Sequence, residues 1–214
     1  VAEVEKLLAD YPAPDGVDLE VGGTVEDQGD AFGDLGTLLI LIVILVYIVM
    51  ATQFESLKFP FIIMFTIPFA FTGVFLALWM TSTPLSLIAL IGAIMLVGIV
   101  TKNGIVMVDY MNLLVERGSG VFDAVIAGGK SRLRPVLMTS FTTILGMLPL
   151  AIGTGVGSET WQPMGIAVIG GLTFSTLLTL FIIPALYSVF VNRSQRKERE
   201  KLARLSAEHQ ASKH

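Results

Sequence analysis

The sequence predicts an all-α polytopic membrane protein with five transmembrane helices, and three observations support this fold class. The 214-residue chain is 53% hydrophobic and only 15% charged, with a mean hydropathy of +0.75. No Asp, Glu, Lys or Arg occurs in residues 35–54, 59–101, 135–158 or 160–192. Each run is long enough to span a bilayer, which takes about 20 apolar residues in a helix. This composition excludes a soluble enzyme and a disordered chain, and a transmembrane barrel would instead alternate over about ten residues.

The N-terminal segment, residues 1–33, is expected to be a short α+β remnant of a water-exposed domain. Residues 1–34 hold ten acidic residues and one lysine. Apolar residues at helical spacing over 4–11 predict a short helix, and alternation over 17–21 predicts a strand. One strand and one helix are too little for a core, so we expect the segment to belong to a larger domain.

The transmembrane bundle is expected over 34–192. The 43-residue run at 59–101 must hold two helices, because one would measure about 65 Å at 1.5 Å per residue. Its break is placed at the turn sequence TSTP, 81–84. Residues 119–129 are expected to form an interfacial cytoplasmic helix that ends at Gly128 and Gly129. The predicted spans lie near 34–53, 60–80, 85–110, 135–153 and 164–191.

Lysine and arginine bias predicts the orientation, with the N-terminus outside and the C-terminus inside. In that orientation, 12 of the 14 basic residues fall in inside segments, and Lys6 is the one basic residue outside. Residues 193–214 form a basic cytoplasmic tail. Because residue 1 is Val and no signal peptide precedes the first span, we expect earlier spans to be missing from this chain.

Several kinds of site are excluded or disfavoured. The chain has no cysteine, and its two histidines, His209 and His214, lie in the tail. No metal site or cofactor is therefore expected, and a Ser-His-Asp triad is disfavoured. A net charge of −4 on a mostly lipid-embedded chain also argues against nucleic-acid binding.

Small residues predict a tightly packed bundle, because they let helix backbones approach closely. The alternative is that glycine is simply common in membrane helices. The expected packing positions are Gly73, Ala89, Ala93, Gly98, Gly165, Gly170 and Gly171.

Lys102 is the main candidate for chemistry, since it lies beside Asn103 within the third span. A mid-membrane lysine costs roughly 2.5–3.5 kcal/mol and normally pairs with an acid. Asp109, seven residues later, shares its helix face about 10 Å away and is a weaker candidate. The alternative is that Lys102 snorkels to the inner surface. No acid lies at a matching depth, so we expect the counter-ion to lie on helices outside this chain.

Arg132 and Thr139 are the second pair of candidates, because they are seven apart on one face of the fourth span. An arginine at the inner mouth with a hydroxyl two turns deeper could order water for proton entry. Two plainer interpretations remain. Arg132 could be a positive-inside topology anchor, and Thr139 could bond its own helix backbone.

Several ordered motifs resemble the C-terminal half of resistance–nodulation–division (RND) efflux permeases, and most closely the hydrophobe/amphiphile branch. The motifs are FESLKFP (54–60), VGIVTKNGIVMVDY (97–110), RLRPVLMTS (132–140), GMLPL (146–150), GTGVGS (153–158) and IGG (169–171). Gly104 stands where many members of that family have alanine.

The resemblance implies a twelve-span homotrimeric permease of the bacterial inner membrane. This chain would supply spans eight to twelve, and residues 1–33 would end the second periplasmic loop. Lys102 and Asn103 match the family's Lys-Asn motif, whose lysine pairs with two aspartates on the missing N-terminal half. Arg132 and Thr139 match its relay residues. A periplasmic adaptor and an outer-membrane channel are the implied partners, besides the lipid bilayer.

The resulting hypothesis is part of a secondary active transporter that exchanges hydrophobic or amphiphilic compounds for protons. The alternatives are an RND-related export factor with a non-drug task and a fragment without function of its own. An intramembrane enzyme would need a water-facing acid or nucleophile within the spans, and the sequence offers none.

Overall fold

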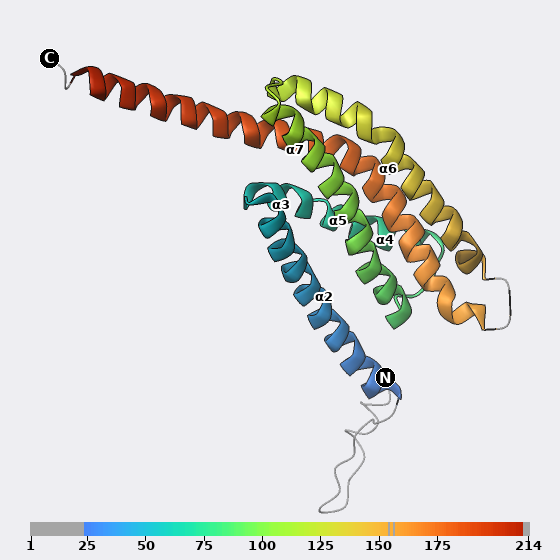
Figure 1. Ribbon diagram of the computed structural model, residues 1–214. Helices are drawn as coiled ribbons and strands as arrows, with labels where there is room; N and C mark the ends of the chain where they lie inside the picture. Colours follow the sequence, from blue (N-terminus) through green and yellow to red (C-terminus); the bar gives the residue numbers. More distant parts are fainter. Residues whose placement is uncertain (1–23, 154, 156, 212–214) are drawn as a thin grey trace, which may run out of the picture. The chain divides into compact units, whose positions relative to one another are not determined.

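The computed structural model describes residues 24–153, 155 and 157–211, with side chains described over 28–153, 155 and 157–191. Among these residues, five stretches are long and apolar enough to cross a membrane, which confirms the predicted all-α fold. The strand and short helix expected before residue 24 lie outside the described residues. The described elements are α2 (Thr24–Phe54), α3 (Lys58–Met64), α4 (Ile67–Met80), α5 (Leu87–Glu116), α6 (Val121–Ile152) and α7 (Ser158–Ala211) (Figure 1).

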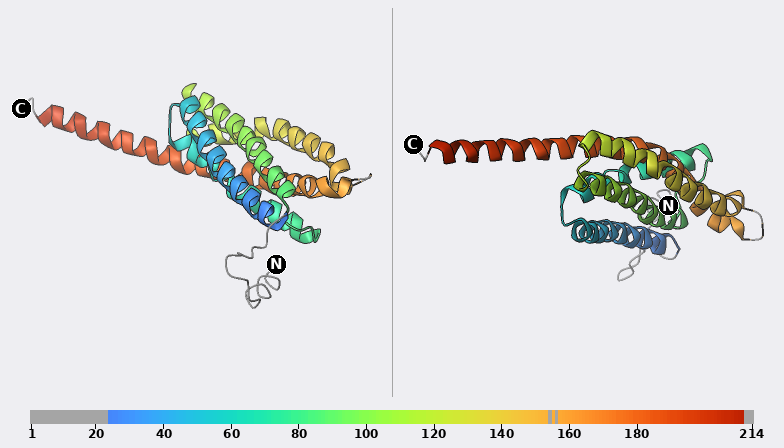
Figure 2. Two further views of the ribbon diagram at one scale, coloured as in Figure 1. Left: turned by 90° about the horizontal axis from the view of Figure 1, so that it is seen from below. Right: turned by 45° about the horizontal axis from the view of Figure 1, so that its top comes forward.

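The chain divides into two units, residues 1–42 and 43–214. In the first unit the described part is the beginning of α2. In the second unit α7 packs against α4, α5 and α6, and Figures 1 and 2 show α6 running alongside α7. One cluster of buried side chains lies between α4, α5 and α7, and partly buried side chains of α6 pack against it. A second cluster lies between α3, α5, α7 and the end of α2.

Small residues line the contacts of α7. A Cβ added to Gly165 would lie 2.7 Å from the backbone nitrogen of Ala151 on α6, which is closer than real Cβ contacts. A Cβ on Gly73 of α4 would lie 2.8 Å from the carbonyl oxygen of Gly170, and one on Gly170 would overlap Ala77. These backbones therefore approach too closely to admit a side chain at the contact.

The other expected packing positions differ in how closely they pack against neighbouring helices. A Cβ on Gly171 would overlap Leu96, and Ala89 and Ala93 are both buried in the core of the unit. Gly98, by contrast, has no described atom within 4 Å of an added Cβ and lies on the exposed face of α5.

The second span differs from the single helix expected over 60–80, because it is divided into α3 and α4 at Phe65 and Thr66. Pro68 lies in the first turn of α4, where it lacks the N–H that would bond the carbonyl of Met64. The Thr66 hydroxyl donates a 2.7 Å bond to the carbonyl of Ile63 at the break. The proline thus restarts the helix within the span.

The separate helix expected over 119–129 is also corrected, since α6 runs unbroken from Val121 to Ile152. Gly128 and Gly129 do not end it. A Cβ on Gly128 would lie 2.7 Å from Cγ of Met111 on α5, so this glycine provides a close approach rather than a stop. The actual stop is Gly153, whose φ of 69° is left-handed.

Candidate functional site

Lys102 lies in the middle of α5 with its side chain exposed on the surface of the described unit. Within the described part of the chain it has neither an ion pair nor a hydrogen-bond partner. Its neighbour Asn103 points inward and is 8% exposed. Adjacent residues of one helix therefore present an ammonium outward and an amide into the bundle.

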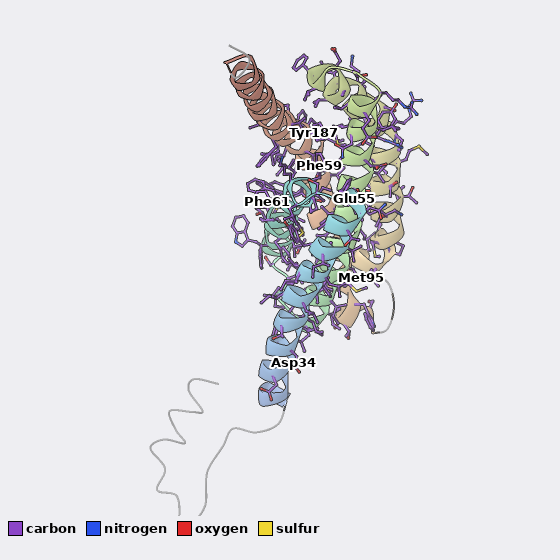
Figure 3. All side chains as sticks on the ribbon, turned by 60° about the vertical axis from the view of Figure 1, so that its left-hand side comes forward. Asp34, Glu55, Phe59, Phe61, Met95 and Tyr187 are labelled. Atoms are coloured by element: carbon purple, nitrogen blue, oxygen red, sulfur yellow. The ribbon has the colours of Figure 1, made fainter. Side chains whose placement is uncertain are left out.

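Lys102 belongs to an exposed stripe on α5, which we define as Ile91, Met95, Gly98, Lys102, Asp109 and Leu113. The members recur at intervals of three, four or seven residues, so they form one face of the helix. The stripe is apolar or small around Lys102. The Met95 side chain is 42% exposed, and Figure 3 labels this residue on α5. A charged group set in such a face offers a specific contact to a further helix.

Asp109 lies on this stripe as the sequence spacing requires, but it forms no salt bridge with Lys102 in the described structure. Two turns of helix separate the two residues, or about 10 Å along the axis. Asp109 is thus on the same face as Lys102 without being its partner.

Arg132 and Thr139 both lie on α6 and are differently placed. Arg132 is partly buried, and its guanidinium carbon lies 4.6 Å from the ring centroid of Tyr110 on α5. Thr139 is exposed, and its hydroxyl donates a 3.0 Å bond to the carbonyl of Pro135 on its own helix. The Thr139 hydroxyl therefore bonds the backbone of its own helix, which is the simpler of its two interpretations.

The structure links the helices that carry these candidates through residues that the sequence reasoning did not single out. Tyr110 connects α5 with α6 by its contact with Arg132. Ser140, next to Thr139, forms a buried 2.9 Å hydroxyl–hydroxyl bond with Thr176 of α7. Both Tyr110 and Ser140 end quoted motifs, but nothing in their spacing reveals which partner they meet.

Metal-ligating side chains do not cluster in the described part of the chain: no group of three or more His, Cys, Asp or Glu could hold an ion there. The two basic candidates lie on neighbouring helices, Lys102 on α5 and Arg132 on α6.

Comparisons with known proteins identify the family of this chain. Residues 1–191 match the model of the AcrB/AcrD/AcrF family. The chain is 37% identical over 197 residues to the swarming motility protein SwrC of Bacillus subtilis, covering 92% of this chain and 19% of SwrC. It is 38% identical over 188 residues to the cobalt-zinc-cadmium resistance protein CzcA of Cupriavidus metallidurans, covering 87% and 18%.

A crystal structure of a heavy metal efflux pump superposes with a TM-score of 0.75 at 30% identity, covering 89% of this chain and 19% of that one. The chain thus spans about a fifth of the length of the relatives it matches. The names of these relatives refer to motility and metals, so the hydrophobe/amphiphile branch stays a prediction. The match over 191 residues and the shared helical fold place this chain in the AcrB/AcrD/AcrF family of RND permeases.

Proposed function

We propose that this chain forms the last five spans of a proton-driven RND exporter in the bacterial inner membrane. The observation that carries the proposal is Lys102, which is exposed on a membrane-spanning helix and has no acidic partner among the described residues. An ammonium in that position is costly in lipid. Its counter-ion then comes from the N-terminal half of the permease, where the family carries a pair of aspartates.

The α5 stripe supports this assignment. Around Lys102 it offers Gly98, with open space where a Cβ would be, and Met95 one turn further. A small residue next to a charged one lets a partner helix approach closely enough for its carboxylates to reach the ammonium. We therefore assign the stripe to the contact with the missing half.

The mechanism follows from the charge balance at this contact. Protons that enter from the periplasm neutralise the aspartate pair, so Lys102 loses its ionic partner and α5 shifts. Each proton that crosses a potential of 100 mV provides about 2.3 kcal/mol, enough to bias a two-state equilibrium more than tenfold. The Asn103 amide lies buried on the same turn of α5. Because protons enter from the periplasm in this mechanism, Arg132 and Thr139 at the inner mouth order water where the proton leaves, and not where it enters as their spacing alone suggested. Asp109 lies further along the stripe, towards that exit.

The whole exporter is proposed to have the architecture that the family resemblance implies. It is a homotrimer that works with a periplasmic adaptor and an outer-membrane channel. The N-terminus of this chain lies on the periplasmic side and the C-terminus in the cytoplasm, in keeping with the basic residues of the tail.

The first candidate substrate class is hydrophobic or amphiphilic compounds, as the motifs of this sequence favour. Divalent metal ions are the second candidate, because CzcA is named for cobalt, zinc and cadmium resistance and the superposed pump for heavy metals. An export task other than drug efflux is the third, and the name of SwrC gives a precedent in a relative.

The test uses the full-length transporter in a host without its own RND pumps. Ethidium and Zn²⁺ efflux are measured with and without a proton gradient, for the wild type, Lys102→Met and the control Lys130→Met. Lys130 is a basic residue exposed on α6. We expect Lys102→Met to abolish gradient-driven efflux and Lys130→Met to retain it.

The choice of probe decides the substrate class. Ethidium efflux without Zn²⁺ efflux supports an amphiphile exporter, and the reverse supports a metal exporter. If Lys102→Met still couples efflux to the proton gradient, the proposed function is wrong. If the wild type moves neither probe, both the amphiphile and the metal substrate class are wrong.

A further inference from the structure

Arg132 and Tyr110 form a cation–π pair. It joins the N-terminal half of α6 to the C-terminal part of α5 with 4.6 Å between the guanidinium carbon and the ring centroid. That distance is well within the roughly 6 Å over which a ring face attracts a cation. The contact thus fixes the guanidinium against a side chain of another helix.

The burial of Arg132 sets it apart from its basic neighbours on the same helix. Lys130 and Arg134 are exposed, as is typical of topology anchors whose charge reaches water. Arg132 is partly buried, and its Nε has no hydrogen-bond partner among the described residues. Its head group is therefore held in the protein, although an exposed position lies only two residues away.

No carboxylate accounts for this placement. Within the described structure Arg132 forms no ion pair and no hydrogen bond, so the ring of Tyr110 is its only recorded partner. Cation–π attraction becomes stronger as the cation loses water, which favours the pair in a partly buried setting. The buried Nε–H remains available to an acceptor that enters from outside the described residues.

We propose that Tyr110 is a positioning residue that holds the guanidinium of Arg132 on the proton path. The inference rests on the proposed function, since it gives a partner to one of the relay residues. The ring restricts Arg132 to one orientation and keeps its Nε–H turned into the protein, where it meets water or an acceptor during transport. An unrestrained arginine would instead be free to leave the contact with α5, and Arg134, two residues later, is exposed.

The same contact couples the two cations. Tyr110 lies eight residues after Lys102 on α5, about 12 Å along the helix axis. A movement of α5 that follows the release of Lys102 therefore shifts the ring under Arg132 and changes the position of the guanidinium on α6.

The first test is chemical and does not depend on transport. Phenylglyoxal modification of Arg132 and Arg134 is followed by peptide mass spectrometry in the full-length transporter. We expect Arg132 to react about fivefold more slowly than Arg134, the factor that corresponds to about 1 kcal/mol. Tyr110→Leu should remove this difference. Tyr110→Phe should preserve it, because the hydroxyl forms no hydrogen bond with the described residues.

The second test measures transport with ethidium or Zn²⁺, whichever the wild type moves. Tyr110→Leu should lower the maximal rate about fivefold and leave the half-saturating concentration unchanged, because substrate is bound elsewhere. Tyr110→Phe should keep the wild-type rate. Arg132→Lys should lower the rate, because an ammonium has no plane to stack on the ring. If Tyr110→Leu does not accumulate, Tyr110→Met replaces it.

The outcomes separate this inference from the proposed function. Equal modification rates for Arg132 and Arg134 in the wild type would overturn it. So would a rate ratio that Tyr110→Leu leaves unchanged, since a merely structural tyrosine would alter only thermal stability. If Lys102→Met still couples efflux to the proton gradient, the proposed function is wrong instead, and the modification rates still test the contact between Tyr110 and Arg132.

Discussion

The phenol of Tyr187 on α7 donates a 2.6 Å hydrogen bond to Oδ1 of Asn112 on α5. The ring of Tyr187 is also stacked on Phe59 of α3, with 5.7 Å between the centroids (Figure 3). At 1% exposure Tyr187 is the largest fully buried side chain described. One side chain thereby fixes α7 to both α5 and α3 near the end of α5, on the helix that carries the proposed relay lysine.

Tyr187→Phe should destabilise this junction. The change retains the stacked ring but leaves Oδ1 of Asn112 without its donor. Interhelical hydrogen bonds in membranes average about 0.6 kcal/mol, with a maximum near 1.7. We expect a lower unfolding temperature for the transporter in detergent. Ser188→Ala is the matched control, because its hydroxyl bonds only its own helix at Ala185. Equal unfolding temperatures for the two variants would contradict the assigned role.

The buried bond between Ser140 and Thr176 should show measurable coupling between α6 and α7. Both hydroxyls are nearly inaccessible, and they lie 2.9 Å apart. In a double-mutant cycle of Ser140→Ala and Thr176→Ala, we expect a coupling of about 0.5–1.5 kcal/mol in the free energy of unfolding. The control cycle pairs Thr142→Ala with Thr176→Ala, since Thr142 bonds its own backbone. A coupling energy as small as that of the control cycle would show that the bond between Ser140 and Thr176 does not stabilise the fold.

Gly165→Ala should destabilise the α6–α7 contact although alanine is the better helix former. An added Cβ would lie 2.7 Å from the backbone nitrogen of Ala151, and a backbone atom cannot turn aside. Overpacking of this kind costs about 1–3 kcal/mol. Gly146→Ala is the control, because nothing described lies within 4 Å of its added Cβ. We expect thermal unfolding to separate the two variants, with Gly146→Ala unchanged or slightly stabilised.

Much of this fold could be predicted from where charge is absent. Four uncharged runs and one turn sequence suffice for five spans, because a spanning helix needs length and apolarity above all. The local effects of single residues were harder to predict. Pro68 divides a span that looked continuous, while Gly128 and Gly129 lie inside a helix that they were expected to end. The proline acts locally through its missing N–H. Gly128, by contrast, lies where α5 comes close, and no local pattern reveals that contact.

The sequence likewise predicts one part of the candidate site and not the other. Lys102 could be found from the sequence because a charge within an apolar helix is rare and costly. Its exposure on the described unit also fits the prediction of a partner outside the chain. The Arg132–Tyr110 contact could not be found, because it depends on the register between α5 and α6. Helical spacing predicts which residues share a face of one helix. It does not predict which side chains of two different helices are in contact.

The final prediction concerns Gly98, which lies one turn before Lys102 on the α5 stripe. Gly98→Leu should leave the unfolding temperature nearly unchanged, because no described atom lies within 4 Å of an added Cβ. It should nevertheless abolish proton-coupled efflux, since a large side chain keeps the partner helix away from the neighbouring ammonium. Gly146→Leu, at an equally open and exposed glycine of α6, should transport normally. Normal efflux by Gly98→Leu would mean that nothing packs closely on the stripe. Lys102 would then need a counter-ion reached in another way, and the proposed contact with the N-terminal half would have to be abandoned.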